Sequence, residues 1–449
     1  MNAHKLTKAV LLTLLINSLF LLFHSPVHAL EVNRKVLDNG MVLMMVERHN
    51  LPIVKVTVGF NAGNLNEPED KAGLASLTAG MLTEGTKTRA AQQISEEIEF
   101  VGGSVGASGG GDYATADLSI LKKDLDLGFE LLSDIILNPV FPDEEITKRK
   151  ERVKGSLKSM EDDPGFLASR EFKKAVFGTH PYGRLQTGTV ETLDNIERQD
   201  LVDFHSAYYL PNNAVMSVVG DITYEEVEAL IEKYFGEWHA GELKAADLPE
   251  ISFVKERKTI TLDKDLTQAN VILGHIGVSR DDPDYYAISV MNYILGGGGF
   301  ASRLMDNIRD EKGLVYSIHS YFAANKYGGS FQVGLQTKNE SANIAVEEIL
   351  KEIEKIRTEP VLDSELSDAK SFLTGSFPMR IDMSRKIASF LVAVEYHGLG
   401  ADYIEKYPGY INSVTKKDIL RVAKKYLDPE NFTLVVVANQ QEAALKEEW

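Results

Sequence analysis

Histidine and cysteine, the side chains most often used for metal binding and nucleophilic catalysis, offer little in this chain of 449 residues. There is no cysteine, which excludes thiol catalysis, thiolate zinc sites, disulfide bonds and a lipidated N-terminal cysteine. No two histidines beyond residue 29 lie three or four positions apart, so no expected helix presents paired imidazoles to one metal ion. These histidines are His49, His180, His205, His239, His275, His319 and His397. A zinc site built from residues distant in sequence stays open.

Two serines lie in the pattern Gly-x-Ser-x-Gly, within one glycine-rich stretch. They are Ser104 and Ser108. A nucleophile elbow needs a strand before the serine and a helix after it, whereas here a helix is expected at 91–101 and a strand at 113–121. A phosphate loop is not indicated either, because no Gly-Lys-Ser/Thr follows. We expect a glycine-rich strand and turn, at which another peptide backbone can approach closely.

Arg309 and Tyr316 are the best candidates for chemistry. Arg309 lies in the last turn of an expected helix that ends at residue 311 or 312, with Gly313 as its cap, and Tyr316 lies in an expected strand at 314–321. A guanidinium and a phenol can both donate hydrogen bonds to an oxygen that becomes negative in a tetrahedral intermediate. The alternative is that Arg309 stabilises the helix C-terminus and Tyr316 is a half-buried strand residue. Their spacing alone leaves both interpretations open.

Periodicity predicts the elements that must position these residues. Residues 32–46 fit a β-hairpin, because Asn39-Gly40 separates two apolar runs. Residues 53–60 alternate apolar and polar as in a half-buried strand, and another buried strand is expected at 214–219. The helices expected from three- and four-residue apolar spacing are 71–82, 91–101, 125–137, 143–160, 200–208 and 224–235. The acidic residues 161–163 are interpreted as a solvated helix end.

The second half of the chain repeats the first at a constant offset. Four pairs of identical residues lie 218 positions apart: Asp200 and Asp418, Tyr208 and Tyr426, Pro211 and Pro429, Asn213 and Asn431. An apolar strand follows in both copies, and residues 236–249 have the composition of a linker. We therefore predict two tandem homologous domains, at 30–240 and 241–449, each within the usual size range.

The helix at 71–82 and the residues after it resemble the zinc helix of the pitrilysin, insulinase and mitochondrial processing peptidase family. Leu74, Leu77 and Met81 form its apolar face, and Thr83-Glu84-Gly85-Thr86 follows. His180-Pro181-Tyr182-Gly183 and Gly313-Leu314-Val315-Tyr316 resemble further family signatures, although His180 by itself is typical of a packed or capping residue. The resemblance extends from Val36 to about Asn439.

In active members of this family the helix carries His-x-x-Glu-His, in which two imidazoles bind zinc and the Glu activates water. Laid on this chain, the two ligand positions hold Ser76 and Gly80, and the base position holds Ala79. The third ligand, a Glu in the family, falls by count at Ser156. The resemblance therefore implies a chain without zinc, whose homologous partner subunit carries the metal.

The resemblance also favours the functional interpretation of Arg309 and Tyr316. In the family, an Arg/Tyr pair at this spacing contacts the substrate carbonyl across the cleft from zinc. The run Gly296, Gly297, Gly298 and Gly299 resembles the flexible loop of the noncatalytic processing-peptidase subunit, which makes it a possible substrate loop.

The implied fold is α+β, with two tandem domains in which helices pack on a mixed, mainly antiparallel sheet. The implied function is that of a noncatalytic, peptide-binding subunit that supplies Arg309 and Tyr316 to the active site of a zinc-bearing partner and is inactive alone. One alternative is a binding or scaffold protein of the same fold without proteolysis. Another is an independent hydrolase with an unrecognised site.

The first 29 residues have the composition of a secretory signal peptide. Lys5 and Lys8 precede an apolar run at 9–23, and Val27-His28-Ala29 fits a cleavage site, so the mature chain is expected to begin at Leu30 in a bacterial periplasm. An uncleaved membrane anchor is the alternative, and no later segment is apolar enough to span a membrane. The formal net charge of −18, which would become −20 on loss of the two lysines, argues against a nucleic-acid partner.

Overall fold

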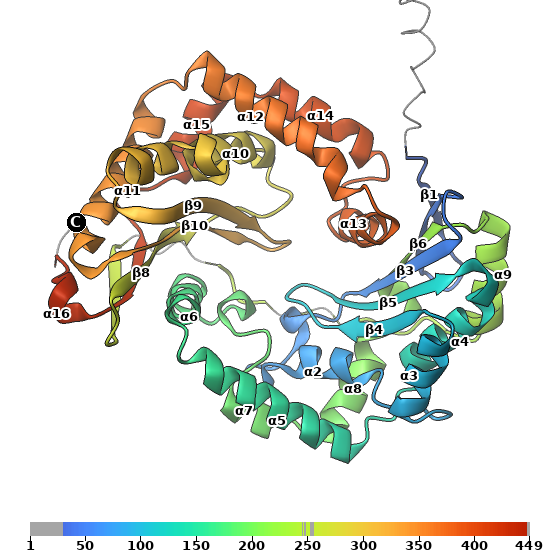
Figure 1. The fold of residues 1–449 in the computed structure, drawn as a ribbon. Helices are drawn as coiled ribbons and strands as arrows, with labels where there is room; N and C mark the ends of the chain where they lie inside the picture. Colours follow the sequence, from blue (N-terminus) through green and yellow to red (C-terminus); the bar gives the residue numbers. More distant parts are fainter. Residues whose placement is uncertain (1–29, 245, 247, 252–255, 447–449) are drawn as a thin grey trace, which may run out of the picture.

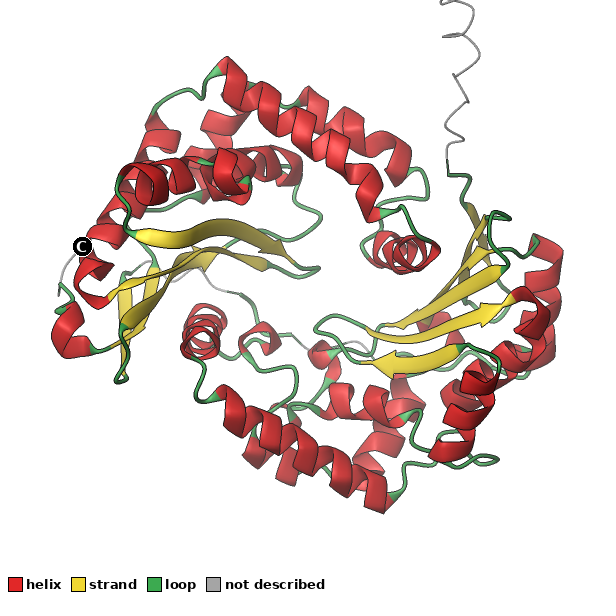
Figure 2. Cartoon of the chain, in the orientation of Figure 1, coloured by secondary structure: helices red, strands yellow, loops and turns green. Residues whose placement is uncertain are grey.

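The fold is given by a computed structural model that describes residues 30–446, apart from 245, 247 and 252–255. The predicted signal peptide lies outside the described residues. Two mixed sheets are covered by helices (Figures 1 and 2), which confirms the predicted α+β class with its duplicated architecture. None of the described helices combines the length and the apolar character that a membrane span requires.

The first sheet has six strands in the order β1-β2-β6-β3-β5-β4. They are β1 (Asn33–Val36), β2 (Val42–Glu47), β3 (Ile53–Phe60), β4 (Ser104–Ser108), β5 (Ala114–Leu121) and β6 (Ala214–Gly220). Only the pair of β2 with β6 is parallel. The predicted hairpin is confirmed: Val36 pairs with Val42, and Gly40 adopts the positive φ of 85° that its turn requires.

The helices of the first half confirm most of the periodicity. They are α2 (Leu74–Met81), α3 (Ala91–Phe100), α4 (Leu125–Leu137), α5 (Asp143–Met160), α6 (Pro164–Phe177), α7 (Val190–Asp194), α8 (Arg198–Tyr208) and α9 (Tyr224–Phe235). Helix α6 was not predicted. Asp163 does not belong to a simple solvated end, since its carboxylate accepts the N–H of Gly165 at 2.8 Å and caps α6, with Pro164 at the first helical position.

The second sheet has the order β7-β11-β8-β10-β9. Its strands are β7 (Lys258–Asp263), β8 (Gln268–Ile276), β9 (Val315–Ala324), β10 (Gly329–Lys338) and β11 (Thr433–Ala438). Around it lie α10 (Tyr285–Asn292), α11 (Ala342–Thr358), α12 (Asp363–Ser376), α13 (Ser384–Tyr396), α14 (Tyr403–Ser413), α15 (Lys416–Tyr426) and α16 (Gln440–Ala443).

The two sheets have the same topology from β2 to β4 and from β7 to β9, and in each the first pair is parallel. Helices α8 and α15 begin and end 218 residues apart. The repeated aspartates both cap the start of their helix. Asp200 accepts the N–H of Glu197 at 2.8 Å, and Asp418 accepts the N–H of Thr415 at 2.9 Å. The repeat in sequence is therefore a repeat in structure.

Each half of the chain contributes one helix that packs on the sheet of the other half. Helix α6 of the first half packs on β8 and β11, while α13 of the second half packs on β3 and β6 (Figure 1). At each contact a glycine in the strand lets the helix approach closely. A Cβ on Gly59 would lie 2.3 Å from Cγ1 of Val392 in α13, and a Cβ on Gly274 would lie 2.9 Å from Cζ of Phe172 in α6. Each half thus completes the core of the other, and the domain boundary at 240 stays a prediction.

Candidate functional site

Helix α2, which the resemblance assigns to zinc binding, has a closed ligand face. Ala79 and Gly80 are buried, and Ser76 is half-buried one turn before Gly80 on the same face. Gly109, just after β4, lies so close that a Cβ on it would be 2.5 Å from Cα of Ser76. Backbone therefore covers the first of the two positions at which active family members carry a histidine.

The guanidinium of Arg149 occupies the space beside Gly80. A Cβ on Gly80 would lie 2.5 Å from Nη2 and 2.9 Å from Cζ of Arg149, so a longer side chain at residue 80 requires Arg149 to swing away. Ser156, the position obtained by count, lies about two turns further along α5 and is exposed. The residue that α5 presents to Gly80 is a cation.

These side chains do not fit a zinc ion. Zinc in peptidases is held by imidazole nitrogens and carboxylate oxygens, whereas this face offers one hydroxyl, one methyl group and a glycine beside a positive charge. The part of the chain that the structure describes holds no group of three His, Asp or Glu side chains placed to share one metal ion. Absence of zinc from the folded protein stays a prediction for metal analysis.

The sequence analysis did not identify Glu67, a buried carboxylate at the N-terminus of α2. Its Oε1 accepts the N–H of Gly73 at 3.0 Å and an N–H of the Asn64 amide at 2.7 Å, and its Oε2 accepts the N–H of Ala75 at 3.0 Å. Burial raises the pKa of Glu67 to about 7, against the opposing effect of these hydrogen bonds. The carboxylate fixes the start of α2 and is enclosed by its own donors.

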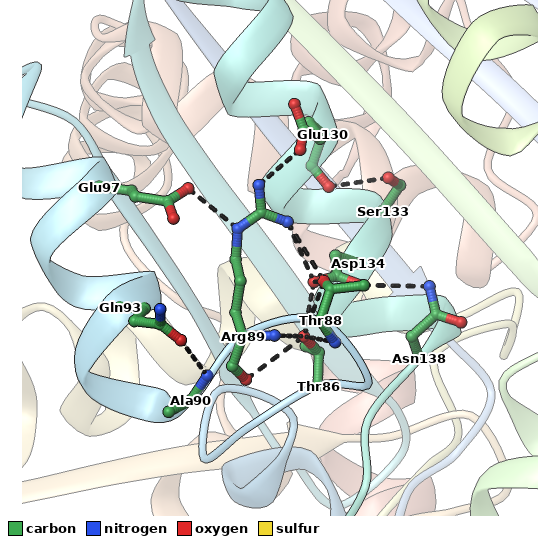
Figure 3. Close-up of polar contacts among 10 residues, drawn as sticks. All are labelled: Thr86, Thr88, Arg89, Ala90, Gln93, Glu97, Glu130, Ser133, Asp134 and Asn138. Atoms are coloured by element: carbon green, nitrogen blue, oxygen red, sulfur yellow. Dashed lines mark hydrogen bonds and ion pairs between the residues drawn. The ribbon is translucent and has the colours of Figure 1, made fainter.

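A second polar network fixes the chain that follows α2 (Figure 3). Asp134 of α4 is 6% exposed and accepts hydrogen bonds from the hydroxyls of Thr86 and Thr88 at 2.6 and 2.8 Å. Arg89 pairs with Asp134 and also with Glu97, at 3.3 and 2.9 Å. All of these charges have partners within the cluster, so the cluster anchors the loop between α2 and α3.

Arg309 and Tyr316 are brought together at one end of β9. Arg309 belongs to a π-helix, η8 (Met305–Glu311), which ends at the predicted glycine: Gly313 has a φ of 62° and donates its N–H to the carbonyl of Arg309 at 3.0 Å. Nε of Arg309 donates to the carbonyl oxygen of Tyr316 at 3.0 Å, and Nη1 donates to the Asp310 carboxylate. The backbone of one residue of the pair thus orients the side chain of the other.

Tyr316 is 88% exposed, so the half-buried strand position considered for it is wrong. It precedes Ile318, which is 1% exposed and anchors β9 in the core. Among the described residues, neither the Tyr316 hydroxyl nor Nη2 of Arg309 has a hydrogen-bond partner. Both donors are available to a ligand oxygen from outside the chain.

The glycine run before η8 is closely packed over three of its four residues. A Cβ on Gly296 would lie 2.5 Å from Oγ of Ser320, one on Gly297 would lie 2.7 Å from Nδ2 of Asn292, and one on Gly298 would lie 2.7 Å from the carbonyl oxygen of Tyr293. Gly299 alone faces open space, with a φ of 58°. A role of the run as a substrate loop stays a prediction, and the packing limits free movement to its last residue.

A cavity of about 500 Å³ lies at the seam between the two halves, lined from one side by Asp112 and Tyr182 and from the other by Tyr321 and Gln332. Asp112 accepts the N–H of Lys326 at 3.2 Å across this seam, and burial raises the pKa of its carboxyl. His180 is 2% exposed, and its Nδ1 accepts the N–H of Tyr182 at 3.2 Å, as expected of a packed, capping residue. These contacts join the halves.

The two serines of the glycine-rich stretch form no nucleophile elbow. Ser104 and Ser108 are the end residues of β4, which follows α3 and leads to β5. The hydroxyl of Ser108 shares a hydrogen bond of 3.2 Å with that of Thr115. The required order of strand, turn and helix is absent around both serines.

Comparisons with known proteins find similarity along most of the chain. Residues 42–189 match the family described as insulinase, peptidase family M16, and residues 195–373 match the peptidase M16 inactive domain. An uncharacterized zinc protease, YmxG of Bacillus subtilis, is 27% identical over 351 residues, 78% of this chain and 85% of that one. The non-peptidase homolog YmxG of Helicobacter pylori is 28% identical over 444 residues, 97% of this chain and 99% of the relative.

A solved structure extends the similarity to three dimensions. The peptidase M16 inactive domain from Pseudomonas fluorescens has a TM-score of 0.85 and 27% identity, covering 91% of this chain and 98% of that one. The stretch that matches the insulinase family includes α2 and most of the residues around it, and the stretch that matches the inactive domain includes Arg309 and Tyr316.

Proposed function

Because the chain belongs to the insulinase and pitrilysin family of peptidases, M16, and lacks the ligands of its zinc helix, we propose that it is the noncatalytic, substrate-binding subunit of a heteromeric zinc peptidase. A homologous partner supplies the metal site, and the substrate is a peptide or an unfolded protein segment. The single observation that carries the proposal is the pair of half-buried Arg309 and exposed Tyr316, in which Nη2 of Arg309 and the Tyr316 hydroxyl have no hydrogen-bond partner among the described residues.

The two side chains suit the stabilisation of an oxyanion. When water adds to a peptide bond, the carbonyl oxygen becomes negative, and preorganised donors close to that oxygen lower the barrier. Nη2 of Arg309 and the hydroxyl of Tyr316 can serve as such donors, and the hydrogen bond from Nε of Arg309 to the Tyr316 backbone carbonyl orients the guanidinium before the reaction. The zinc of the partner would supply the activation of water.

The proposed place of action rests on the composition of the first 29 residues. Residues 1–29 have the order of a cleaved signal peptide, so the complex is proposed to work in a bacterial periplasm, with this subunit beginning at Leu30. Protein sequencing of the subunit from the cell envelope tests this: a first residue of Leu30 supports export with cleavage, and an intact Met1 contradicts it.

A non-proteolytic binding or scaffold protein is the second candidate. One observation favours it: the Helicobacter pylori relative, which spans 97% of this chain, is named a non-peptidase homolog. In that case the exposed pair would bind a peptide or a partner protein without cleavage, and no zinc-bearing homologue would be needed.

The discriminating experiment is reconstitution. The mature chain is mixed with a zinc-bearing homologue from the same cell, assembly is followed by gel filtration, and hydrolysis of an unstructured peptide is measured with and without a chelator. Activity that needs both chains and is lost with the chelator supports the subunit. Stable assembly without hydrolysis, or no assembly with any such homologue, favours the scaffold.

A further inference from the structure

Phe300 forms an aromatic extension of the Arg309 and Tyr316 pair. Its ring is 72% exposed, and the guanidinium carbon of Arg309 lies 4.9 Å from its centroid and 5.9 Å from that of Tyr316. Both distances are within the range of cation–π contacts. Two exposed rings therefore flank the guanidinium whose Nη2 has no partner among the described residues.

Phe300 is held in place by a short turn. It is the middle residue of the 3₁₀ turn η7 (Gly299–Ala301), whose ends are fixed by the hydroxyl of Ser302, which donates to the carbonyl of Gly299 at 2.6 Å, and by the N–H of Gly298, which donates to the carbonyl of Tyr293 at 2.9 Å. Ser302 is 1% exposed. The ring is exposed at a turn that these hydrogen bonds close, and an exposed apolar ring beside polar donors that lack a partner among the described residues is typical of a binding site.

We infer that Phe300 determines substrate specificity by receiving an apolar side chain of the residue that flanks the scissile bond. A peptide whose carbonyl oxygen reaches Nη2 of Arg309 brings its neighbouring side chain within reach of the two flanking rings. Burial of an aromatic or branched aliphatic side chain on Phe300 removes apolar surface from water on both partners, which a small or charged side chain cannot match. The preferred substrates are peptides with Phe or Leu beside the cleaved bond, and this inference rests on the proposed function.

The test compares peptides that differ only at the residue flanking the cleaved bond, using the reconstituted complex. Phe300→Ala is expected to lower kcat/KM about tenfold for the Phe and Leu peptides, and less than about twofold for the Ala peptide. Phe300→Leu should keep most of the preference, because it retains apolar surface. Phe100→Ala is the matched control, since Phe100 of α3 is 91% exposed in the other half of the chain and should leave all three peptides unchanged.

The outcomes separate direct contact from positioning. An equal loss of kcat/KM for all three peptides would show that Phe300 only orients Arg309. An unchanged kcat/KM would show that the ring does not contact the peptide, and either result overturns the inference. If the wild-type complex cleaves no peptide, the proposed function fails, and the inference is decided by fluorescence anisotropy of the same labelled peptides with the mature chain. Phe300→Ala must then weaken binding of the Phe and Leu peptides selectively, and equal affinities for wild type and variant contradict it.

Discussion

The two halves of the chain share one topology but treat their family-related residues in opposite ways. In the first half, Ala79 and Gly80 are buried, backbone lies against Ser76, and Arg149 fills the remaining space. In the second half, β9, the edge strand that corresponds to β4 of the first sheet, carries Tyr316 with 88% of its surface exposed. The first region is closed to a ligand, whereas the second presents donors that have no partner among the described residues.

The difference shows how a duplicated fold can keep its scaffold and change its chemistry. Strands β4 and β9 occupy the same place in the two strand orders, each at one edge of its sheet. The family-related residues lie on different elements, because Ser76 and Gly80 are packed on α2 whereas Tyr316 is exposed on β9, and with that placement the capacity to hold a metal ion or an oxyanion differs. The predictions below test whether the closed region is inert and the open region is functional.

The largest effect is expected from the open region. In the reconstituted complex, Tyr316→Phe or Arg309→Ala should lower turnover on the order of a hundred- to a thousandfold, since loss of one oxyanion donor commonly costs about 2.7–4 kcal/mol. Arg309→Lys should not rescue fully, because a point charge does not reproduce the planar fork. Steady-state kinetics after gel filtration provide the measurement. Full activity in both variants would return the pair to a structural role.

In the closed region, Glu67 should make stability depend on pH. Its folded pKa of about 7 lies above the ordinary value of 4.5, so the native state holds a proton that the unfolded chain has released. That contribution to the free energy of unfolding is fully present below about pH 4.5 and is lost as pH rises through about 7, a change of about 3 kcal/mol. Glu67→Gln should remove this decline in urea unfolding curves.

Glu69→Gln is the matched control for Glu67, because this carboxylate lies two residues further on and is 74% exposed. It should leave the pH dependence of the free energy of unfolding as it is in the wild type. A wild-type curve parallel to that of Glu67→Gln between pH 4.5 and 7 would mean that the buried carboxylate is ionised throughout.

The exchange of helices predicts similar damage in both halves. Gly59→Ala and Gly274→Ala should each destabilise by about 1–3 kcal/mol, because the new methyl group overlaps Val392 in one case and Phe172 with the Phe331 carbonyl in the other. Val392→Ala should relieve the first clash. Gly106→Ala in β4, where a Cβ meets nothing within 4 Å, serves as the control. If thermal unfolding shows that only one of the two substitutions lowers the stability of the protein, the two helix contacts are not equivalent.

The smallest effect concerns Arg149 and an engineered metal site. A chain with Ser76→His and Gly80→His regains the two imidazoles of the family's zinc helix, yet Arg149, which must swing aside to admit the side chain at residue 80, remains on the neighbouring turn of α5 and should repel a divalent cation by about 2 kcal/mol. Adding Arg149→Ala is expected to raise zinc affinity ten- to thirtyfold, as measured by competition with a chromogenic chelator. Arg152→Ala, at an exposed position three residues on, should change little. Equal effects of the two substitutions would show that Arg149 does not oppose the metal.

Local patterns were sufficient for much of this fold. The strand at 53–60 and the helices at 125–137, 143–160 and 224–235 have the predicted bounds, because their apolar spacing is regular and, in the last of them, Thr223 caps the first turn. Helix α6 was missed although Asp163 and Pro164 carry a helix start, since the acidic run was interpreted as the end of α5. The helix exchange could not be predicted, because it depends on which sheet a helix packs against.

The candidate site was predicted in part. Arg309 and Tyr316 were proposed from their spacing and from the resemblance, and the structure shows that Nε of Arg309 contacts the Tyr316 backbone and that Tyr316 is exposed. Their role as a site stays a prediction. Arg149 was not found because it acts through a contact with Gly80, which is distant in the sequence. Glu67 was not found although its partners Gly73 and Ala75 lie only six and eight residues further on, because the loop that turns its carboxylate onto the start of α2 has no apolar periodicity. Phe300 gave no signal beyond its place after four glycines.

The division of chemistry between two chains is tested most directly by a titration with metal analysis. A fixed amount of the zinc-bearing homologue receives increasing amounts of the mature chain, and peptide hydrolysis and zinc content are measured on the assembled complex. Activity should rise to saturation at one chain per partner, and the saturated complex should hold one zinc for each pair of chains. Hydrolysis that is independent of this chain, or a second zinc held by it and lost on mutation of the Ser76 face, would contradict the account.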